Sequence, residues 1–81
     1  MSVIVEADRI RLVGAATVED AEPLLAALVD HPGHPVDVAD LVRAHLAVVQ
    51  LLHAAGRRLS GRPEDPFLRA MALGPLMQVD A

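Results

Sequence analysis

Residues 36–56 of the chain read VDVADLVRAHLAVVQLLHAAG, and they contain the clearest structural pattern in the sequence. Val36–Ala39 is a short, mainly β-branched segment and predicts a strand. From Arg43 to Ala55 the apolar residues recur at helical spacing, over a face wide enough for a largely buried helix. Gly56 stands where a left-handed C-cap is expected. A strand that leads directly into a buried helix is typical of an α/β fold.

Upstream of this stretch, the pattern predicts a β-hairpin. Val3–Val5 is a β-branched run, and Arg9–Val13 alternates apolar and polar residues. The break at Ala7-Asp8 leaves room only for a tight turn. We therefore expect a hairpin whose second strand ends at Gly14.

A helix is predicted between the hairpin and the central strand, from Thr17 to Asp30. Thr17 is a favourable N-cap, and acidic residues follow it in the first turn. Pro23 is tolerated only in the opening turn of a helix, so we expect the regular helix to begin near Asp20 after a looser turn. The Pro-Gly turn at residues 32–33 ends it.

Downstream, Arg57–Gly61 predicts a weak edge strand. Asp65 and Pro66 are an N-cap followed by proline, which predicts a third helix. The expected order is β-β-α-β-α-β-α in a single domain spanning 1–81, with a core of about 3–73 and a tail at 74–81.

The composition of the 81 residues excludes several function classes. The chain has no cysteine and no lysine, which excludes disulfide scaffolds, zinc-thiolate sites and Schiff-base chemistry. Its net charge of -4 argues against nucleic acid or an anionic membrane as the main partner. No phosphate-binding glycine motif or membrane-spanning run is present, and we expect no signal peptide. We expect a cytoplasmic, non-catalytic protein without a cofactor.

Four histidines, His31, His34, His45 and His53, are numerous enough to suggest a metal site. None of them stands four residues from another, which is the helical spacing that lets two imidazoles share a metal. We therefore predict no metal site. The alternative is a small-molecule or metal sensor that uses His45, His53 and Asp40.

Charged residues offer two further candidates, each with a structural alternative. Asp37 and Asp40 stand around the end of the central strand, where open sheets place their ligand sites. They also fit a turn cap and an exposed strand position. Arg57, Arg58 and Arg62 can bind an acidic partner, or they can protect a sheet edge from aggregation.

The central helix is more apolar than one buried face requires. The excess suggests either a docking surface or a helix enclosed by both of its neighbours. The residues concerned are Leu41, Val42, Leu46, Ala47, Val48, Val49, Leu51 and Leu52.

The strand at Val36–Leu41 followed by the helix at Leu46–Ala55 resembles the centre of the STAS domain, the sulfate-transporter and anti-sigma-factor-antagonist family. The upstream hairpin and helix and the weak strand near Leu59 also fall in the family's order. The resemblance implies a small mixed sheet with helices packed mainly on one face. It also implies a regulatory protein-binding role, with an ATP-binding kinase or the ATPase subunit of a lipid transporter as partner.

The sequence departs from this family at the position that matters for regulation. Phosphorylatable antagonists carry an Asp-Ser pair at the start of the second helix, and His45 and Leu46 stand there in this chain. No serine or threonine occurs between Thr17 and Ser60. The resemblance thus implies docking without a serine switch, or an accessory STAS subunit of an ABC-type transporter.

We therefore expect a protein partner to bind around the start of the central helix. Self-association into a homodimer through this helix or the last one is the other interaction that the sequence allows. The predicted partner-binding residues are Asp40, Arg43, His45, Leu46 and Val49.

Overall fold

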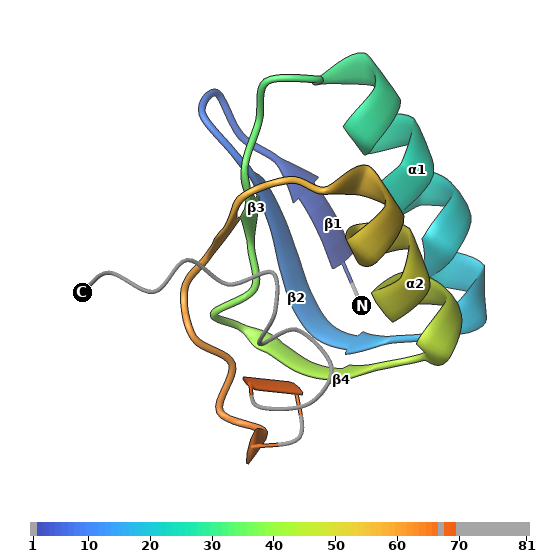
Figure 1. Ribbon diagram of the computed structural model, residues 1–81, viewed down its shortest axis with the longest axis vertical. Coiled ribbons are helices and arrows are strands. Elements are labelled where there is room, and N and C mark those ends of the chain that lie inside the picture. The colour runs from blue at the N-terminus through green and yellow to red at the C-terminus, as the bar shows by residue number, and fades with distance from the viewer. Residues whose placement is uncertain (1, 67, 70–81) are drawn as a thin grey trace.

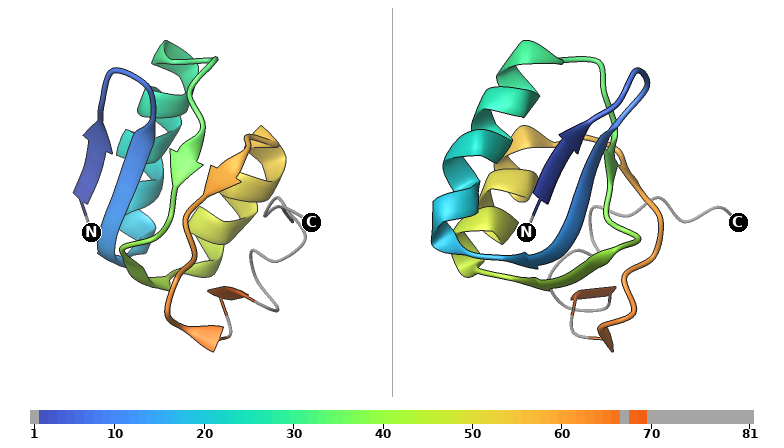
Figure 2. Two further views of the ribbon diagram at one scale, coloured as in Figure 1. Left: turned by 90° about the vertical axis from the view of Figure 1, so that its left-hand side faces the viewer. Right: turned by 180° about the vertical axis from the view of Figure 1, so that it is seen from behind.

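The computed structural model describes residues 2–66, 68 and 69 of the chain. These residues form a mixed sheet of five strands, and their two α-helices lie together on one face of it (Figure 1 and Figure 2). The α/β class and the one-sided helix layer predicted from the sequence are confirmed. The elements are β1 (Ser2–Val5), β2 (Ile10–Ala16), the 3-10 turn η1 (Val18–Asp20), α1 (Ala21–Asp30), β3 (Val36–Asp37), β4 (Leu41–Ala44), α2 (Leu46–Ala55) and β5 (Leu59–Ser60).

Strand β2 is at the centre of the pairing. The predicted hairpin is present, because β1 runs antiparallel to β2 with Ile4 opposite Arg11. On its other edge, β2 pairs in parallel first with β3 and then, from Gly14 to Ala16, with β4. β5 runs parallel to β3 and forms the edge of the sheet, as predicted for the segment after α2.

β2 continues past Gly14, where the sequence predicted its end. Gly14 has a φ of 88°, a conformation that a residue without a Cβ adopts at little cost. The register with β4 shifts between Gly14 and Ala15. The glycine therefore bends the strand and changes its partner, instead of ending it.

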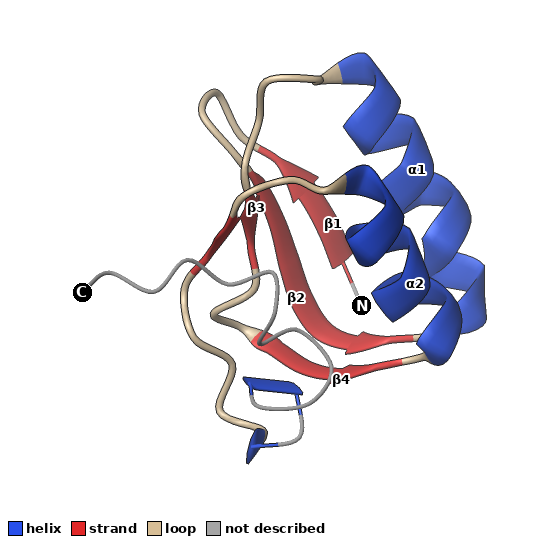
Figure 3. Ribbon diagram, viewed as in Figure 1, coloured by secondary structure: helices blue, strands red, loops and turns tan. Residues whose placement is uncertain are grey.

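The helix predicted from Arg43 begins at Leu46, because the residues before it form β4 (Figure 3). Arg43 lies opposite Ala15 in the parallel ladder with β2. Four residues are too few for their apolar pattern to separate a strand from a helical turn. Pairing with a strand that is distant in the sequence decides the conformation, so the predicted start was wrong.

The loose turn predicted before α1 is η1. The N–H and the hydroxyl of Thr17 donate to the carboxylate of Asp20 at 2.7 and 3.1 Å, and the Asp20 N–H donates to the Thr17 carbonyl at 3.1 Å. The bond from the Thr17 N–H lowers the pKa of Asp20. Because α1 begins at Ala21, Pro23 lies in its first turn, where it removes no helical hydrogen bond.

The end of α2 agrees with its prediction. Gly56 has a φ of 61°, and its N–H donates to the Leu52 carbonyl at 3.2 Å. It is the left-handed C-cap expected from the sequence.

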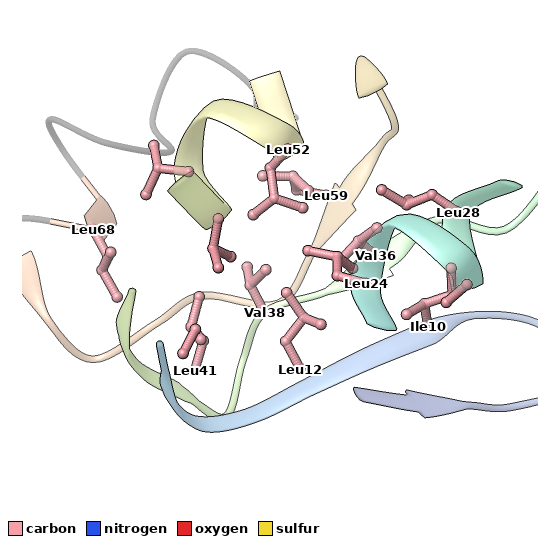
Figure 4. Close-up of a cluster of buried hydrophobic side chains, with 14 residues drawn as sticks. Ile10, Leu12, Leu24, Leu28, Val36, Val38, Leu41, Leu52, Leu59 and Leu68 are labelled. Atoms are coloured by element: carbon pink, nitrogen blue, oxygen red, sulfur yellow. The ribbon is translucent and has the colours of Figure 1, made fainter. Parts of the chain in front are cut away.

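The core lies between the sheet and the two helices (Figure 4). Alternate residues of β2 point into it, as do the inner faces of α1 and α2. Its buried side chains are Ile10, Leu12, Ala16, Leu24, Ala27, Leu28, Val36, Val38, Leu41, Val48, Val49, Leu52, Leu59 and Leu68.

The start of the predicted third helix is visible at the end of the described chain. The Arg69 N–H donates to the Asp65 carbonyl at 3.1 Å, which is the spacing of an α-helical turn. The rest of the predicted helix and the predicted tail fall on residues 67 and 70–81, which lie outside the described residues. Within the part that the structure describes, no helix has the length and apolar character that crossing a membrane requires.

Candidate functional site

One end of the molecule brings together the ends of β2 and β4 and the start of α2. Ala16 and Ala44 are paired there in the parallel ladder. The His45 N–H donates to the Ala16 carbonyl at 2.8 Å, so the chain enters α2 directly beside the end of β2. η1, which follows β2, contacts α2 at the same end.

Three large apolar side chains are exposed at this end. The exposed fraction is 64% for Leu46, 59% for Val42 and 56% for Val18. Arg43 and His45 are exposed beside them. We call the surface formed by these five residues the docking end. Exposed apolar side chains on adjoining elements, with a cationic residue beside them, are typical of a protein interface.

His45 is the N-cap of α2. Its Nδ1 accepts a hydrogen bond from the Ala47 N–H at 3.0 Å, and its backbone is extended. The ring thus satisfies one of the free amides at the helix start, a role usually taken by Ser, Thr, Asp or Asn. Because Nδ1 accepts, the neutral ring carries its proton on Nε2. His45 therefore has a structural role in addition to its exposed position.

The structure separates the predicted partner-binding residues. Arg43, His45 and Leu46 lie at the docking end. Val49 is only 9% exposed and belongs to the core, so it offers no surface to a partner. Asp40 precedes β4, at the opposite end of that strand from His45.

A surface cavity of about 560 Å³ adjoins the docking end. Its walls come from β4 with the turn before it and from the segment Glu64–Pro66. Val42 and Arg43 belong to both the cavity and the docking end. A side chain of a bound partner therefore has a hollow to enter beside the exposed apolar residues.

Asp40 lines this cavity and also belongs to a cluster of charges around Arg9 and Arg11, which alternate with the buried Ile10 and Leu12. Arg11 donates to Asp40 at 3.0 Å and to Glu6 at 3.4 Å, while Arg9 donates to Glu6 at 2.8 Å and to Asp37 at 3.2 Å. We call these five residues the ionic network. The hydrogen bond from Arg9 lowers the pKa of Glu6, with a smaller contribution from Arg11.

The ionic network was not predicted from the sequence, although one signal pointed to it. Ile10 and Leu12 alternate with Arg9 and Arg11, so burying the former places both arginines on the outer face. Their acidic partners depend on the register of the sheet, which the sequence does not show.

Asp37 is a structural residue and not an exposed one. Its side chain is 14% exposed. Oδ1 accepts from the Ala39 N–H at 2.9 Å, and Oδ2 accepts from Arg9. The carboxylate thus closes the turn between β3 and β4 and is held by the ionic network.

Arg57 also has a structural role. It donates to the carbonyls of Leu28, His31 and His34, at 2.6, 2.9 and 3.2 Å. These carbonyls lie at and after the end of α1, where helices leave acceptors unsatisfied. The bonds hold the end of α1 against the end of α2.

The histidines are spread over the fold. The rings of His31 and His34 are 4.8 Å apart between centroids, and His34 Nε2 lies 3.0 Å from the Glu6 carbonyl. Among the residues that the structure describes, no three His, Cys, Asp or Glu side chains come close enough to hold a metal ion. The geometry thus adds no support to the sensor hypothesis built on His45, His53 and Asp40.

Comparison of the chain with models of protein families, with curated proteins and with solved structures gives no match. The geometry of the docking end and the resemblance noted in the sequence are therefore the basis for a functional proposal.

Proposed function

We propose that this protein is a non-catalytic, STAS-like docking module that binds a protein partner through the docking end. The observation that carries the proposal is the exposure of Val18, Val42 and Leu46 at one end of a small domain. Leaving three large apolar side chains in water is unfavourable, and covering them with a partner surface recovers that free energy.

The arrangement of the elements supports the STAS-like part of the proposal. A hairpin comes first, then a helix, a parallel strand, a second helix and a further parallel strand. Both helices lie on one face of the sheet, as the resemblance implies. β4 lengthens the segment between the central strand and α2, and it brings Arg43 and Val42 to the surface beside the start of that helix.

Leu46 occupies the place that the resemblance assigns to a phosphorylated serine. It is the first residue of α2, directly after the N-cap His45. A leucine has no hydroxyl group to accept a phosphoryl group, so docking at this position is not controlled by a serine kinase. The exposed leucine instead offers a permanent apolar anchor to a partner.

The resemblance indicates the class of partner: an ATP-binding kinase of the anti-sigma type or the ATPase subunit of a transporter. The docking end requires a partner surface with an apolar pocket for Leu46 and a carboxylate near Arg43. Such partners would place the protein in the cytoplasm.

The experiment is an affinity capture from an extract of the native source, with the bound proteins identified by mass spectrometry. The baits are the parent chain, Leu46→Asp and Leu25→Asp. Leu25 is a matched control because it is also an exposed helical leucine, at 48%, but lies on α1 away from the docking end. Circular dichroism establishes that all three baits are folded.

We expect the parent and Leu25→Asp to retain one ATPase or kinase, which is then tested as a purified protein, and Leu46→Asp to lose it. Equal binding of that purified partner to the parent and to Leu46→Asp would contradict the proposed surface. A partner with no ATP-binding domain would contradict the proposed partner class while leaving the surface intact.

A further inference from the structure

A second apolar surface lies between α1 and α2. Two adjoining hollows of about 640 and 330 Å³ form one groove there, because Leu25, Leu51 and Ala54 line both of them. None of the docking-end residues lines this groove. It is therefore a separate surface from the one used in the proposed function.

The groove is more apolar than the outer side of a helix pair in contact with water. Leu25 is 48% exposed and Val29, one turn later on α1, is 67% exposed. On the other side, α2 has no Asp, Glu, Lys or Arg between Leu46 and Ala55. Solvated helices carry charged residues on their outer face, so this pair is suited to being covered.

The groove carries opposite charges at its two ends. Glu22 lines the hollow near the starts of the helices, and Arg57 lines the hollow near their ends. α1 and α2 run in the same direction along the sheet, as Figure 1 shows, so these two residues mark opposite ends of one straight surface. The bonds from Arg57 to the backbone of α1 hold its positive charge in place.

We propose that a second copy of this chain covers the groove and forms a two-fold symmetric homodimer. The two-fold axis lies in the plane of the interface, perpendicular to the length of the groove and near Leu25 and Leu51. Rotation about it places the two grooves face to face and reverses the direction of the second one. Glu22 of each copy then meets Arg57 of the other, and the leucines meet their own counterparts near the axis. An interface formed by one patch with itself requires this self-complementarity.

Charge is the reason for choosing a second copy over an unrelated partner. An unrelated partner helix with basic residues at both of its ends would be repelled by Arg57, and a partner helix with acidic residues at both ends would be repelled by Glu22. A copy in reversed orientation satisfies both ends at once. A chain of this size also buries a limited fraction of its own surface, so dimer formation adds apolar burial that one domain lacks.

Sedimentation equilibrium of the full chain, from low micromolar to millimolar concentration, tests the proposal. We expect the parent to dimerise. Glu22→Arg places two like charges against each other at both ends, and the dimer should dissociate at roughly tenfold lower affinity or worse. Glu19→Arg is the matched control, because Glu19 is exposed near the same helix end but lines neither hollow, and its dimer affinity should be unchanged.

Two leucine variants separate this surface from the docking end. Leu25→Asp should weaken the dimer about a hundredfold by placing a carboxylate at its centre, while Leu46→Asp should leave it intact. A parent that stays monomeric over the whole range overturns the proposal. So does an equal loss in Glu19→Arg and Glu22→Arg, or dissociation caused by Leu46→Asp but not by Leu25→Asp. These results are independent of partner capture, since the two leucines act in opposite ways in the two experiments.

Discussion

Gly61 lies directly against Asp37, across the parallel pair of β3 and β5. A Cβ added at Gly61 would come within 2.7 Å of Asp37 Oδ1 and within 2.6 Å of the Ala39 Cβ. Gly61 also has a φ of 78°, which side chains rarely adopt. The turn that leads from β3 to β4 thus depends on the absence of a side chain at Gly61, the residue that follows β5.

We therefore expect Gly61→Ala to lower the free energy of unfolding by about 1–3 kcal/mol, from backbone strain and the clash with this turn. Urea denaturation followed by circular dichroism measures the change. Gly33→Ala is the control, because a Cβ at Gly33 meets nothing within 4 Å. Its effect should be within about 0.5 kcal/mol, and equal losses in the two variants would contradict the packing described here.

The cap of α2 predicts that two substitutions at His45 differ in their effect on stability. His45→Ala removes the acceptor for the Ala47 N–H and should destabilise the protein by about 0.5–2 kcal/mol. His45→Asp supplies a carboxylate acceptor at the same place and should retain the stability of the parent. Chemical denaturation of the three proteins distinguishes capping from packing of the ring, because packing would make the two variants equally unstable.

Arg57 and Arg58 are adjacent in sequence but differ in their contacts. Arg57→Ala removes the guanidinium donor from the carbonyls of Leu28, His31 and His34 and should cost about 1–3 kcal/mol of stability. Arg58→Ala changes an exposed side chain and should cost about 0.5 kcal/mol or less. Thermal unfolding of both variants checks the difference. Equal melting temperatures would show that the bonds from Arg57 contribute nothing net.

Acid should destabilise the protein through Glu6 and Asp20, whose pKa values are lowered from 4.5 and 3.8 by their hydrogen-bond donors. Such a carboxyl binds fewer protons in the folded state than in the unfolded state. Its stabilisation is complete above the ordinary pKa and is lost as the pH falls through the folded value. The free energy of unfolding should therefore fall as the pH decreases below about 4.5.

Glu6→Gln tests this origin of the acid sensitivity. The variant should be less stable than the parent at neutral pH, and its stability should decrease less steeply in acid. Urea titrations over a pH series measure both effects. Glu64→Gln, at an exposed position outside the ionic network, is the control and should reproduce the slope of the parent. A parental slope in Glu6→Gln would exclude the ionic network as the cause.

The sequence predicted those parts of the fold that depend on local chemistry. Thr17, Pro23 and Gly56 act through their own backbone or their near neighbours, so helix α1 and the end of α2 follow from the residue types. β4 could not be predicted, because its conformation depends on pairing with Ala15 and Ala16. The prediction that β2 ends at Gly14 was wrong for the same reason, since a glycine at a bend and a glycine at a strand end look alike in sequence.

The candidate site was predicted to a similar extent. Arg43, His45 and Leu46 are close in the chain, so any local structure keeps them near one another. Val49 was wrongly expected to be accessible beside them, because the rotation of α2 turns it inward. Asp40 is exposed and lines the cavity together with Val42 and Arg43, although it lies at the other end of β4 from His45. The apolar excess on α2 also has two explanations, since Val48, Val49 and Leu52 are buried while Ala47 and Leu51 line the groove.

The bend at Gly14 has a consequence for how the protein opens. Because β2 changes partner there, it pairs with β1, β3 and β4, and only β5 lies apart from it. Releasing β2 leaves β3 and β5 as the one remaining ladder among the described strands. We therefore expect the amide protons of its buried residues Ile10 and Leu12 to exchange with solvent mainly through unfolding of the whole domain. β1, β4 and β5 each pair with a single strand, so we expect their amide protons to exchange by local opening and the centre of the sheet to be the most protected.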